Sequence, residues 1–222
     1  MQNSFRGGDY ACSHFFCIKE NIFSIGTTPE NVFEIRAGMF NADVVAATCP
    51  SSISDEKLQT SLIGDSKQRK EHLGSLENRI RVFSRFLDQA SITILKKCEI
   101  KRMRNVFHLH SVFEGRLKSD LDFYDILPSL MPMISARPQE LRSFADPQKT
   151  PLRYYGGLVG RHHMQDSGCY LNIRNLTLKN GTLYATAGAG IMKESTALAE
   201  FEEVNSKVSG VFESVHLWDY KS

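Results

Sequence analysis

The sequence has no apolar run near the roughly 20 residues that a membrane-spanning helix requires. Its first residues, MQNSFRGGDY, contain neither the apolar segment nor the cleavage site of a secretory signal peptide. The five cysteines form no Cys-x-x-Cys pair, and their odd number argues against a disulfide framework. Together these absences predict a soluble protein of the reducing cytoplasm, without a membrane partner.

An excess of charge of one sign is also lacking. The 27 basic and 25 acidic residues give a formal charge of +2, which offers no case for a nucleic-acid partner. The one basic run, KKCEIKRMR at residues 96–104, fits a solvated strand edge or loop better than a phosphate-binding patch. No internal repeat or low-complexity stretch is present. A length of 222 residues and a hydrophobic content of 41% predict a single domain over residues 1–222.

Strand-like and helical patterns follow one another in blocks. Residues 14–25 predict a hairpin that turns at Lys19-Glu20-Asn21, and GTTPE (26–30) predicts the end of that hairpin. Apolar residues at spacings of three and four between positions 54 and 88 predict one helix, or two divided at Gly64. Strands are expected again over residues 91–117.

The last third of the chain contains the strongest short-range turn signal. Asn180-Gly181 predicts a hairpin within residues 168–188, and a final helix is expected from about Thr196 to Glu213 with Ser195 as N-cap. Because strands and helices do not alternate as βαβ units, the pattern predicts an α+β fold with largely antiparallel sheets.

The clearest functional signal lies around the final helix. On a helix, Glu200, Glu203 and Lys207 share one face over about two turns. The AGAG turn at residues 187–190 precedes this helix, where bare backbone N–H groups favour an anion. Glutamates beside a bound anion would suit Mg²⁺, which prefers oxygen ligands. Arg174, on the polar face of a strand with Tyr170 and Asn172, could bind a carboxylate through two parallel hydrogen bonds. A solvated Glu–Lys stripe and an exposed sheet arginine are the structural alternatives.

Several blocks of sequence, taken in order, resemble the C-terminal catalytic domain of chorismate-utilising enzymes. That family includes isochorismate, salicylate, anthranilate and aminodeoxychorismate synthases. The blocks are GTTPE (26–30), VVAAT (44–48), DSKQRKEH (65–72), HLHSVFEGRL (108–117), YYGGLVG (154–160), LNIRNLTLKNG (171–181), AGAGI (187–191) and EFEEVNSK (200–207). The resemblance implies a fold like that of anthranilate synthase component I, with antiparallel sheets packed face to face and flanked by helices.

The resemblance also implies roles for individual residues. Glu30 matches the general acid that protonates the departing ring hydroxyl, and His108 matches an active-site histidine. Substrate contacts are implied for Thr48, Tyr155, Arg174, Gly188, Ala189, Gly190 and Lys207, and Mg²⁺ binding for Glu71 and Glu203 with Glu200 beside them. The implied function is Mg²⁺-dependent conversion of chorismate to isochorismate, as in menaquinone or siderophore biosynthesis.

The chain also departs from the family pattern. Ala47 stands where the family has glycine, and Gln68 replaces the first glutamate of the helix motif. The resemblance further implies that the chain is N-terminally incomplete. It lacks the strand whose lysine activates water in the isochorismate branch, and Lys19 is a poor substitute. We therefore expect the chain alone to turn over chorismate poorly.

The branches of the family differ in the nucleophile. Water serves the isochorismate and salicylate synthases. Ammonia serves the anthranilate and aminodeoxychorismate synthases, for which a glutamine amidotransferase subunit is a conditional partner. The stretch LGSLENRIRVF (73–83) is closer to the isochorismate pattern and favours water. An amino-transferring component, a salicylate synthase, and an inactive fragment or paralogue that only binds its ligand remain as alternatives.

Overall fold

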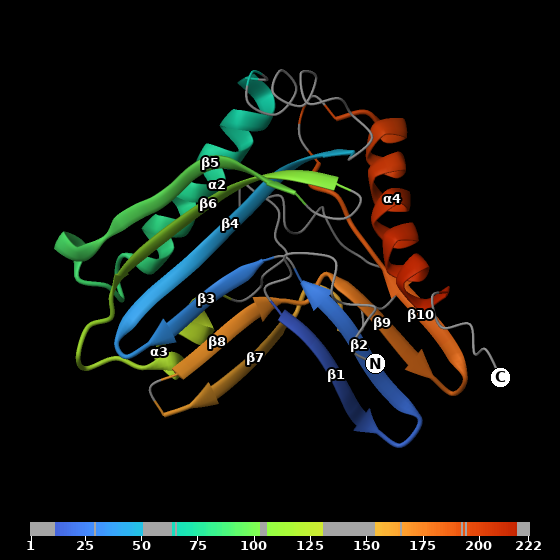
Figure 1. The fold of residues 1–222 in the computed structure, drawn as a ribbon, viewed down its shortest axis with the longest axis horizontal. Coiled ribbons are helices and arrows are strands. Elements are labelled where there is room, and N and C mark those ends of the chain that lie inside the picture. The colour runs from blue at the N-terminus through green and yellow to red at the C-terminus, as the bar shows by residue number, and fades with distance from the viewer. Residues whose placement is uncertain are drawn as a thin grey trace.

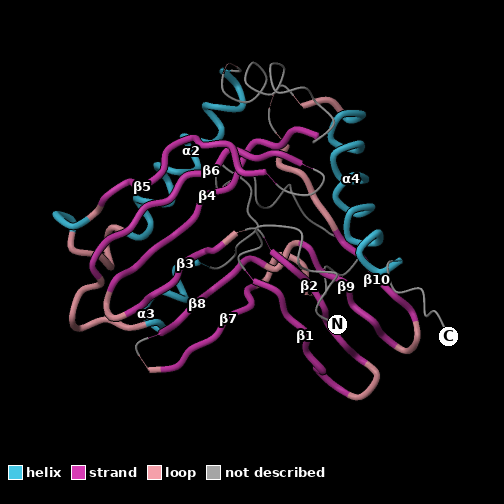
Figure 2. Tube along the Cα trace, in the orientation of Figure 1, coloured by secondary structure: helices cyan, strands magenta, loops and turns pink. Residues whose placement is uncertain are grey.

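A computed structural model describes residues 12–28, 30–50, 64, 66–102, 106–130, 154–164, 166–191, 193 and 195–216. Within these ranges the protein consists of two antiparallel sheets and two long helices (Figures 1 and 2). The six-stranded sheet has the order β5(Thr93–Arg102), β6(Val106–Arg116), β4(Met39–Pro50), β3(Asn31–Arg36), β8(Asp166–Leu171), β7(Leu158–His163). The four-stranded sheet has the order β1(Cys12–Lys19), β2(Ile22–Thr28), β9(Arg174–Lys179), β10(Thr182–Thr186). The expected α+β fold is therefore confirmed.

Each sheet has a long helix beside it. Helix α2(Ser66–Phe83) packs on β4, and helix α4(Ala197–His216) contacts β9 and β10 (Figure 1). Two short helical segments, α3(Phe123–Ile126) and η3(Leu127–Leu130), follow β6, and η2(Gln89–Ser91) precedes β5. None of the helices in the described part of the chain is both long and apolar enough to cross a membrane.

The main core lies between α2 and the six-stranded sheet. Phe33, Phe40, Phe83 and Phe113 are fully buried there, and the rings of Phe40 and Phe83 are 4.7 Å apart between centroids. Alternation along β3 and β4 places one apolar face against the helix, whose own apolar stripe includes Leu76. This packing fixes α2 firmly on the sheet and with it the start of the helix near the site.

The chain crosses between the two sheets at two places that lie side by side. It leaves β2 after Thr28 and enters β3 at Asn31; later it leaves β8 after Leu171 and enters β9 at Arg174. Because β2 pairs with β9 and β3 pairs with β8, the two crossings run next to each other. The Leu171 N–H donates to the carbonyl of Glu30 at 3.4 Å across them. We call Glu30 and the pair Asn172–Ile173 the sheet junction.

The hairpin predictions are confirmed. β1 and β2 turn at Glu20-Asn21, and β9 and β10 turn at Asn180-Gly181. Asn180 and Gly181 both have positive φ angles, as a type I′ hairpin turn requires, and in the β1–β2 turn Asn21 has a positive φ angle. The strands expected over residues 91–117 are β5 and β6.

Other predictions were wrong in detail. Gly26–Thr28 are the last residues of β2 rather than a break, because they pair with both β1 and β9. Residues 168–179 are not one strand, since the chain changes sheet at Asn172–Ile173, so Tyr170 and Arg174 do not share a strand face. The final helix begins at Ala197, and Thr196 rather than Ser195 accepts from the Ala199 N–H at 3.4 Å. Residues 51–63, part of the expected helical segment, lie outside the described residues.

Candidate active site

A cavity of ≈ 260 Å³ opens beside the sheet junction. Both long helices begin at the top of Figure 1, and residues near the start of each, Glu71 in α2 and Glu200 in α4, line the cavity. Its lining comes from both sheets, both helices and the segment between β10 and α4: Glu30, Val45, Ala46, Gln68, Glu71, His108, Tyr155, Ile173, Arg174, Ala187, Gly188, Gly190, Ser195, Glu200, Glu203 and Lys207. Residues far apart in sequence therefore surround one space of the size of a small metabolite.

Most of the residues selected from the sequence line this cavity. Glu71 and Glu203, 132 positions apart (203 − 71), face the same space. Ala189 is not among the lining residues. Thr48 lies in β4, paired in register with His108 of β6, and its side chain lies outside the described residues. The structure thus brings most of the selected residues together around one cavity.

Carboxylates dominate the charge of the cavity. Four glutamates (Glu30, Glu71, Glu200 and Glu203) line it, and the lysine and arginine residues among its lining are Lys207 and Arg174. Lys207 already has partners, because its Nζ lies 2.5 Å from Oε1 of Glu203 and donates to the carbonyl of Gly188 at 2.9 Å. An anionic ligand would therefore meet a surplus of negative charge unless a cation accompanied it.

Tyr155 and Arg174 interact with each other in the lining of the cavity. Burial raises the pKa of the Tyr155 phenol, while the Arg174 guanidinium and a hydrogen bond with the Gly188 backbone act to lower it. A Cβ atom on Gly188 would lie 3.1 Å from the Tyr155 hydroxyl, which makes glycine the residue that best fits this close approach. The arrangement presents a phenol, a guanidinium and bare backbone to a carboxylate.

The turn that carries Tyr155 is held by the sheet junction. The Asn172 side chain donates to the Tyr154 carbonyl at 2.8 Å, and the Gly156 N–H donates to the Asn172 carbonyl at 2.8 Å. Gly156 has a φ of 73°, a conformation that favours glycine. Asn172 therefore fixes Tyr155 next to Arg174.

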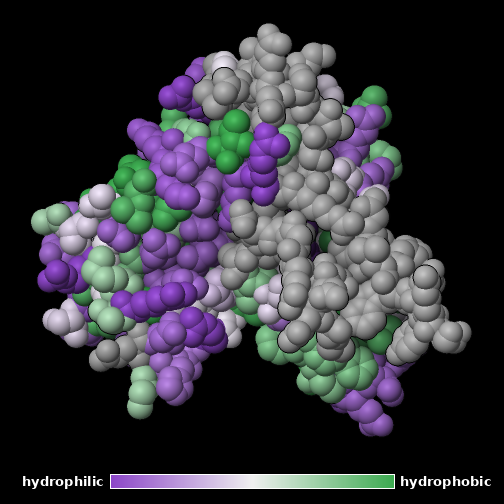
Figure 3. All heavy atoms as spheres, viewed as in Figure 1, coloured by the Kyte–Doolittle hydropathy of each residue, from purple (hydrophilic) through white to green (hydrophobic). Residues whose placement is uncertain are grey.

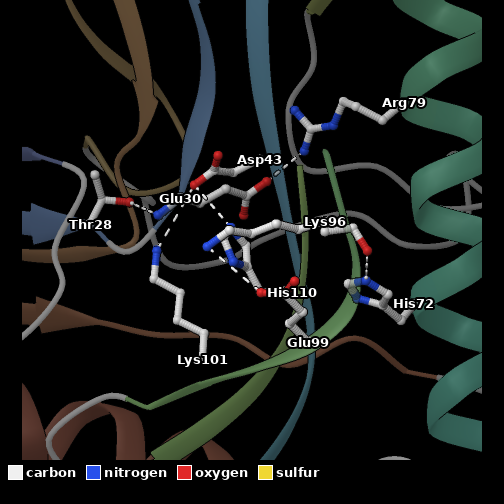
Figure 4. Close-up of polar contacts among 10 residues, drawn as sticks. Thr28, Glu30, Asp43, His72, Arg79, Lys96, Glu99, Lys101 and His110 are labelled. Carbon is white, nitrogen blue, oxygen red and sulfur yellow. Dashed lines mark hydrogen bonds and ion pairs between the residues drawn. The ribbon is translucent and has the colours of Figure 1, made fainter. Parts of the chain in front are cut away.

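Glu30, in the other crossing of the sheet junction, is almost fully buried, with 7% of its surface exposed. Nη2 of Arg79 donates to its Oε1 at 2.5 Å (Figure 4). Burial raises the pKa of Glu30, and the Arg79 guanidinium partly opposes that rise. A carboxylic acid with a raised pKa in a shielded cavity is suited to donate a proton.

The glutamates provide the type of ligand that Mg²⁺ binds. Within the described residues, however, no group of three or more His, Cys, Asp and Glu side chains is arranged to hold a metal ion. Glu203 is also paired with Lys207. Mg²⁺ usually binds one or two carboxylates together with water and substrate, so Glu71 with Glu200 or Glu203 fits a site that substrate completes.

Two expectations about this region need correction. The AGAG turn does not open directly into a helix, because residues 191–196 lie between Gly190 and the start of α4 at Ala197. The dipole of α4 therefore does not act at the turn itself. Sequence reasoning also missed Arg79, although a signal existed. Arg79 lies three residues after buried Leu76 and four before buried Phe83, on the apolar stripe of α2, where a charge needs a partner.

Comparison with known proteins places this geometry in context. The sequence profile described as chorismate binding enzyme matches residues 3–213. Anthranilate synthase component 1 of Pseudomonas aeruginosa is 29% identical over 205 residues, which are 87% of this chain and 41% of that protein.

Two solved structures share the fold. Anthranilate synthase component I from Streptococcus pneumoniae superposes with a TM-score of 0.78 at 27% identity, over 91% of this chain and 46% of that chain. MenF, the menaquinone-specific isochorismate synthase from Escherichia coli, has a TM-score of 0.79 at 20% identity, over 91% and 48%. The chain thus spans less than half the length of these proteins.

Proposed function

Since this chain belongs to the family of chorismate binding enzymes, we propose that it binds chorismate with Mg²⁺ in the cavity at the sheet junction. One observation carries the proposal. Residues from separate stretches of sequence that match the substrate-, metal- and proton-donating positions of the family line a single cavity. A cytoplasmic location is part of the same proposal.

The two carboxylates of chorismate would be bound on opposite sides of the cavity. Arg174, Tyr155 and the backbone at Gly188 would receive one carboxylate through charge-assisted hydrogen bonds. Glu71, with Glu200 or Glu203, would hold Mg²⁺ close to the other. When bound, the ion neutralises the repulsion between substrate carboxylate and glutamates, and it orients the ring.

Glu30 would supply the proton for the leaving group. The ring C–O bond breaks and the hydroxyl leaves as water with the proton of Glu30, while a nucleophile forms a new bond to the ring. A base must accept a proton from that nucleophile, so that with water one molecule enters and one leaves and the product is an isomer of chorismate. Burial supports this role, since it raises the pKa of Glu30.

Water is the nucleophile that we propose first, with isochorismate as the product. The support is the sequence of α2, LGSLENRIRVF (73–83), which resembles the isochorismate branch. Salicylate synthesis would follow the same first step.

Ammonia is the second candidate, because relatives from Pseudomonas aeruginosa and Bacillus subtilis, at 29% and 26% identity, are named anthranilate synthase component 1. In that case the product is aminated, and a glutamine amidotransferase subunit would be a partner that supplies ammonia.

Chorismate binding tests the proposal directly. Isothermal titration of chorismate into the chain should give binding in the presence of Mg²⁺ and little or none in EDTA. Glu203→Gln should weaken the Mg²⁺-dependent binding. Glu202→Gln, an exposed neighbour that does not line the cavity, should leave it unchanged. Equal affinity with and without Mg²⁺, or no binding at all, would contradict the proposed site.

Product analysis then separates the two nucleophiles. The chain is incubated with chorismate and Mg²⁺, with and without ammonium salt, and the products are separated by chromatography. Isochorismate formed in both incubations supports water, whereas an aminated product formed only with ammonium supports the second candidate. Because slow turnover is expected of this chain alone, the incubations are long enough to detect it, and binding without any product would then favour a chain that only binds its ligand.

A further inference from the structure

A cluster of buried charges lies behind the cavity, around Glu30. It contains Arg79 from α2, Asp43 from β4, Lys101 from β5 and His110 from β6 (Figure 4). Oδ2 of Asp43 lies 3.3 Å from Nε2 of His110 and 3.9 Å from Nζ of Lys101. The side chains of Asp43, Lys101 and His110 are each exposed by no more than 13%. Charges buried to this degree are costly unless they are paired, and even a paired cluster is rarely kept for stability alone. We therefore asked what the cluster does to its neighbour Glu30.

The backbone leaves room for this cluster. β3 and β4 are paired in register only over Glu34–Arg36 and Met39–Asn41, and beyond that point the two strands diverge (Figure 1). Glu30 stands where β3 has already left β4. Arg79 thus reaches Glu30 from the helix-covered side of the sheet. Asp43, next to inward-facing Ala42 and Val44 in β4, points to the other face.

Arg79 constrains which oxygen of Glu30 can carry a proton. A guanidinium has only donors, so while Nη2 of Arg79 donates to Oε1 of Glu30, the acid favours its proton on Oε2 and keeps Oε1 as the stronger, carbonyl-type acceptor. The backbone of Glu30 is fixed as well, because its N–H donates to Oγ1 of Thr28 at 3.3 Å. The carboxyl group therefore has a defined orientation relative to the cavity that it lines.

The other charges act on the same group in opposite directions. Burial and the Asp43 carboxylate raise the pKa of Glu30, whereas Arg79 and Lys101 lower it. His110 faces Asp43, and His108, two residues before it on β6, lines the cavity with Glu30. Burial is the largest of these effects on the pKa of Glu30, and Asp43 is the charged neighbour that acts in the same direction as burial.

We propose that Arg79 and Asp43 are opposed positioning residues for Glu30. Arg79 holds Oε1 so that the proton is carried on Oε2, and Asp43, held by Lys101 and His110, opposes the loss of that proton. The inference rests on the proposed role of Glu30 as the proton donor. Neither Arg79 nor Asp43 lines the cavity, so both act through Glu30 and not on the substrate.

The test is a carboxyl-carbon NMR titration of the 25.1 kDa chain labelled with [¹³C]glutamate at the side-chain carboxyl. Glu30→Gln identifies the resonance of Glu30. In Arg79→Met, Glu30 should bind its proton about tenfold more tightly or more, the effect of losing an opposite charge at this distance. In Asp43→Asn, Glu30 should bind its proton more weakly than in the wild type.

Matched controls isolate the effect. Arg81→Met removes an exposed arginine two residues along the same helix, whose partner is Asn78, and should leave the titration of Glu30 unchanged. Arg79→Lys keeps the positive charge and should restore most of the wild-type titration. If Arg79→Met fails to fold, Arg79→Gln replaces it, because it removes the charge and keeps a hydrogen-bond donor. Opposite shifts in Arg79→Met and Asp43→Asn support the proposal. Unchanged titration in all variants, or shifts in the same direction, would overturn it.

The titration requires no chorismate, so its outcome is independent of the proposed function. If Glu30 responds as expected but the chain does not bind chorismate, the proposed function fails and the coupling of the three residues stands. If the chain turns over chorismate, the alkaline limb of kcat should move upward in pH with Arg79→Met and downward with Asp43→Asn. A merely structural role would lower kcat without moving that limb.

Discussion

The two sheets of this protein are stabilised in different ways. The six-stranded sheet buries closely packed phenylalanine rings under α2. The four-stranded sheet instead buries polar side chains: the Asn175 amide donates to Oγ of Ser24 at 2.5 Å, and Thr177 donates to Asn175 at 3.2 Å. Its outer strand exposes Phe15 and Phe16, and apolar side chains gather over the β1–β2 hairpin in Figure 3.

The residues of the candidate site are divided between the same two sheets and their helices. The well-packed half supplies Glu71 and His108, from α2 and β6, while Arg174 and the α4 glutamates come with the less apolar half. Glu30 lies at the junction. Arg79 of the well-packed half pairs with Glu30, whereas Arg174, proposed to bind a substrate carboxylate, comes with the less apolar half.

The largest expected effect is on the core of the six-stranded sheet. Phe40→Ala should lower the free energy of unfolding by about 3–5 kcal/mol, because it leaves a cavity among the rings of Phe33, Phe83 and Phe113. Phe16→Ala, in the exposed strand β1, should change it by no more than about 0.5 kcal/mol. Urea denaturation followed by circular dichroism measures both. Similar losses of unfolding free energy in the two variants would contradict the proposed difference between the sheets.

Acid should weaken the six-stranded sheet more than the four-stranded one. His72 is fully buried against Oγ of Ser111 at 2.7 Å, and burial lowers its pKa to about 4 from an ordinary 6.5. The unfolded chain therefore binds the extra proton between pH 6.5 and about 4, so about 3 kcal/mol of stability is lost as the pH falls through this range.

His72→Gln should remove most of that loss, measured as the difference in unfolding free energy between pH 7 and pH 4. The matched variant is His14→Gln in β1 of the four-stranded sheet. His14 also has a pKa lowered by burial, but it is half-buried and the change should be smaller. A larger change with His14→Gln than with His72→Gln would contradict the assignment.

Replacing the arginine of the less apolar half should affect binding and not folding. Arg174→Ala should weaken chorismate binding by about 1.5–3 kcal/mol, the range for a hydrogen bond to a charged group. Calorimetric titration with Mg²⁺ present provides the measurement, and Arg36→Ala, an exposed arginine outside the cavity, is the control. An unchanged affinity in Arg174→Ala would remove this residue from the site.

The smallest expected effect concerns the polar cluster of the four-stranded sheet. Ser24→Ala removes the acceptor of the Asn175 amide and should cost about 1–3 kcal/mol if that amide is left unsatisfied. The double variant Ser24→Ala with Asn175→Leu replaces both partners by apolar groups and should recover part of the loss. A double variant less stable than Ser24→Ala would mean that the polar cluster is needed for packing as well as for hydrogen bonding.

Local features of the fold could be predicted because their causes are local. The turns at Asn21 and Asn180 follow from residues that tolerate positive φ, and the stripe of α2 follows from helical periodicity. The crossing at Asn172–Ile173 could not be predicted, since the alternation of polar and apolar residues continues through it. Only the pairing of β3 with β8 and of β2 with β9 separates the two strands.

Sequence motifs located the residues of the candidate site, but they did not predict the charged residues that surround Glu30. Sequence blocks identified Glu30, Glu71 and Glu203, whereas the pair of Glu30 with Arg79 depends on how α2 packs on the diverging strands. Asp43 gave no signal of its own, because a single acidic residue in a strand is ordinarily exposed. Burial of a side chain by residues distant in sequence depends on how the sheets assemble, so no short stretch of sequence predicts it.

The pairing of β2 with β9 also sets an order for folding. Ser24 and Asn175, which meet in the four-stranded sheet, are 151 positions apart in the chain. At the roughly 5–20 residues per second of protein synthesis, the β1–β2 hairpin would wait on the order of ten seconds for its partner strand. During that time Phe23 and its neighbours lack the strand that later pairs with them, and contacts of such long sequence separation form slowly. The nascent hairpin is therefore where chaperones should bind first.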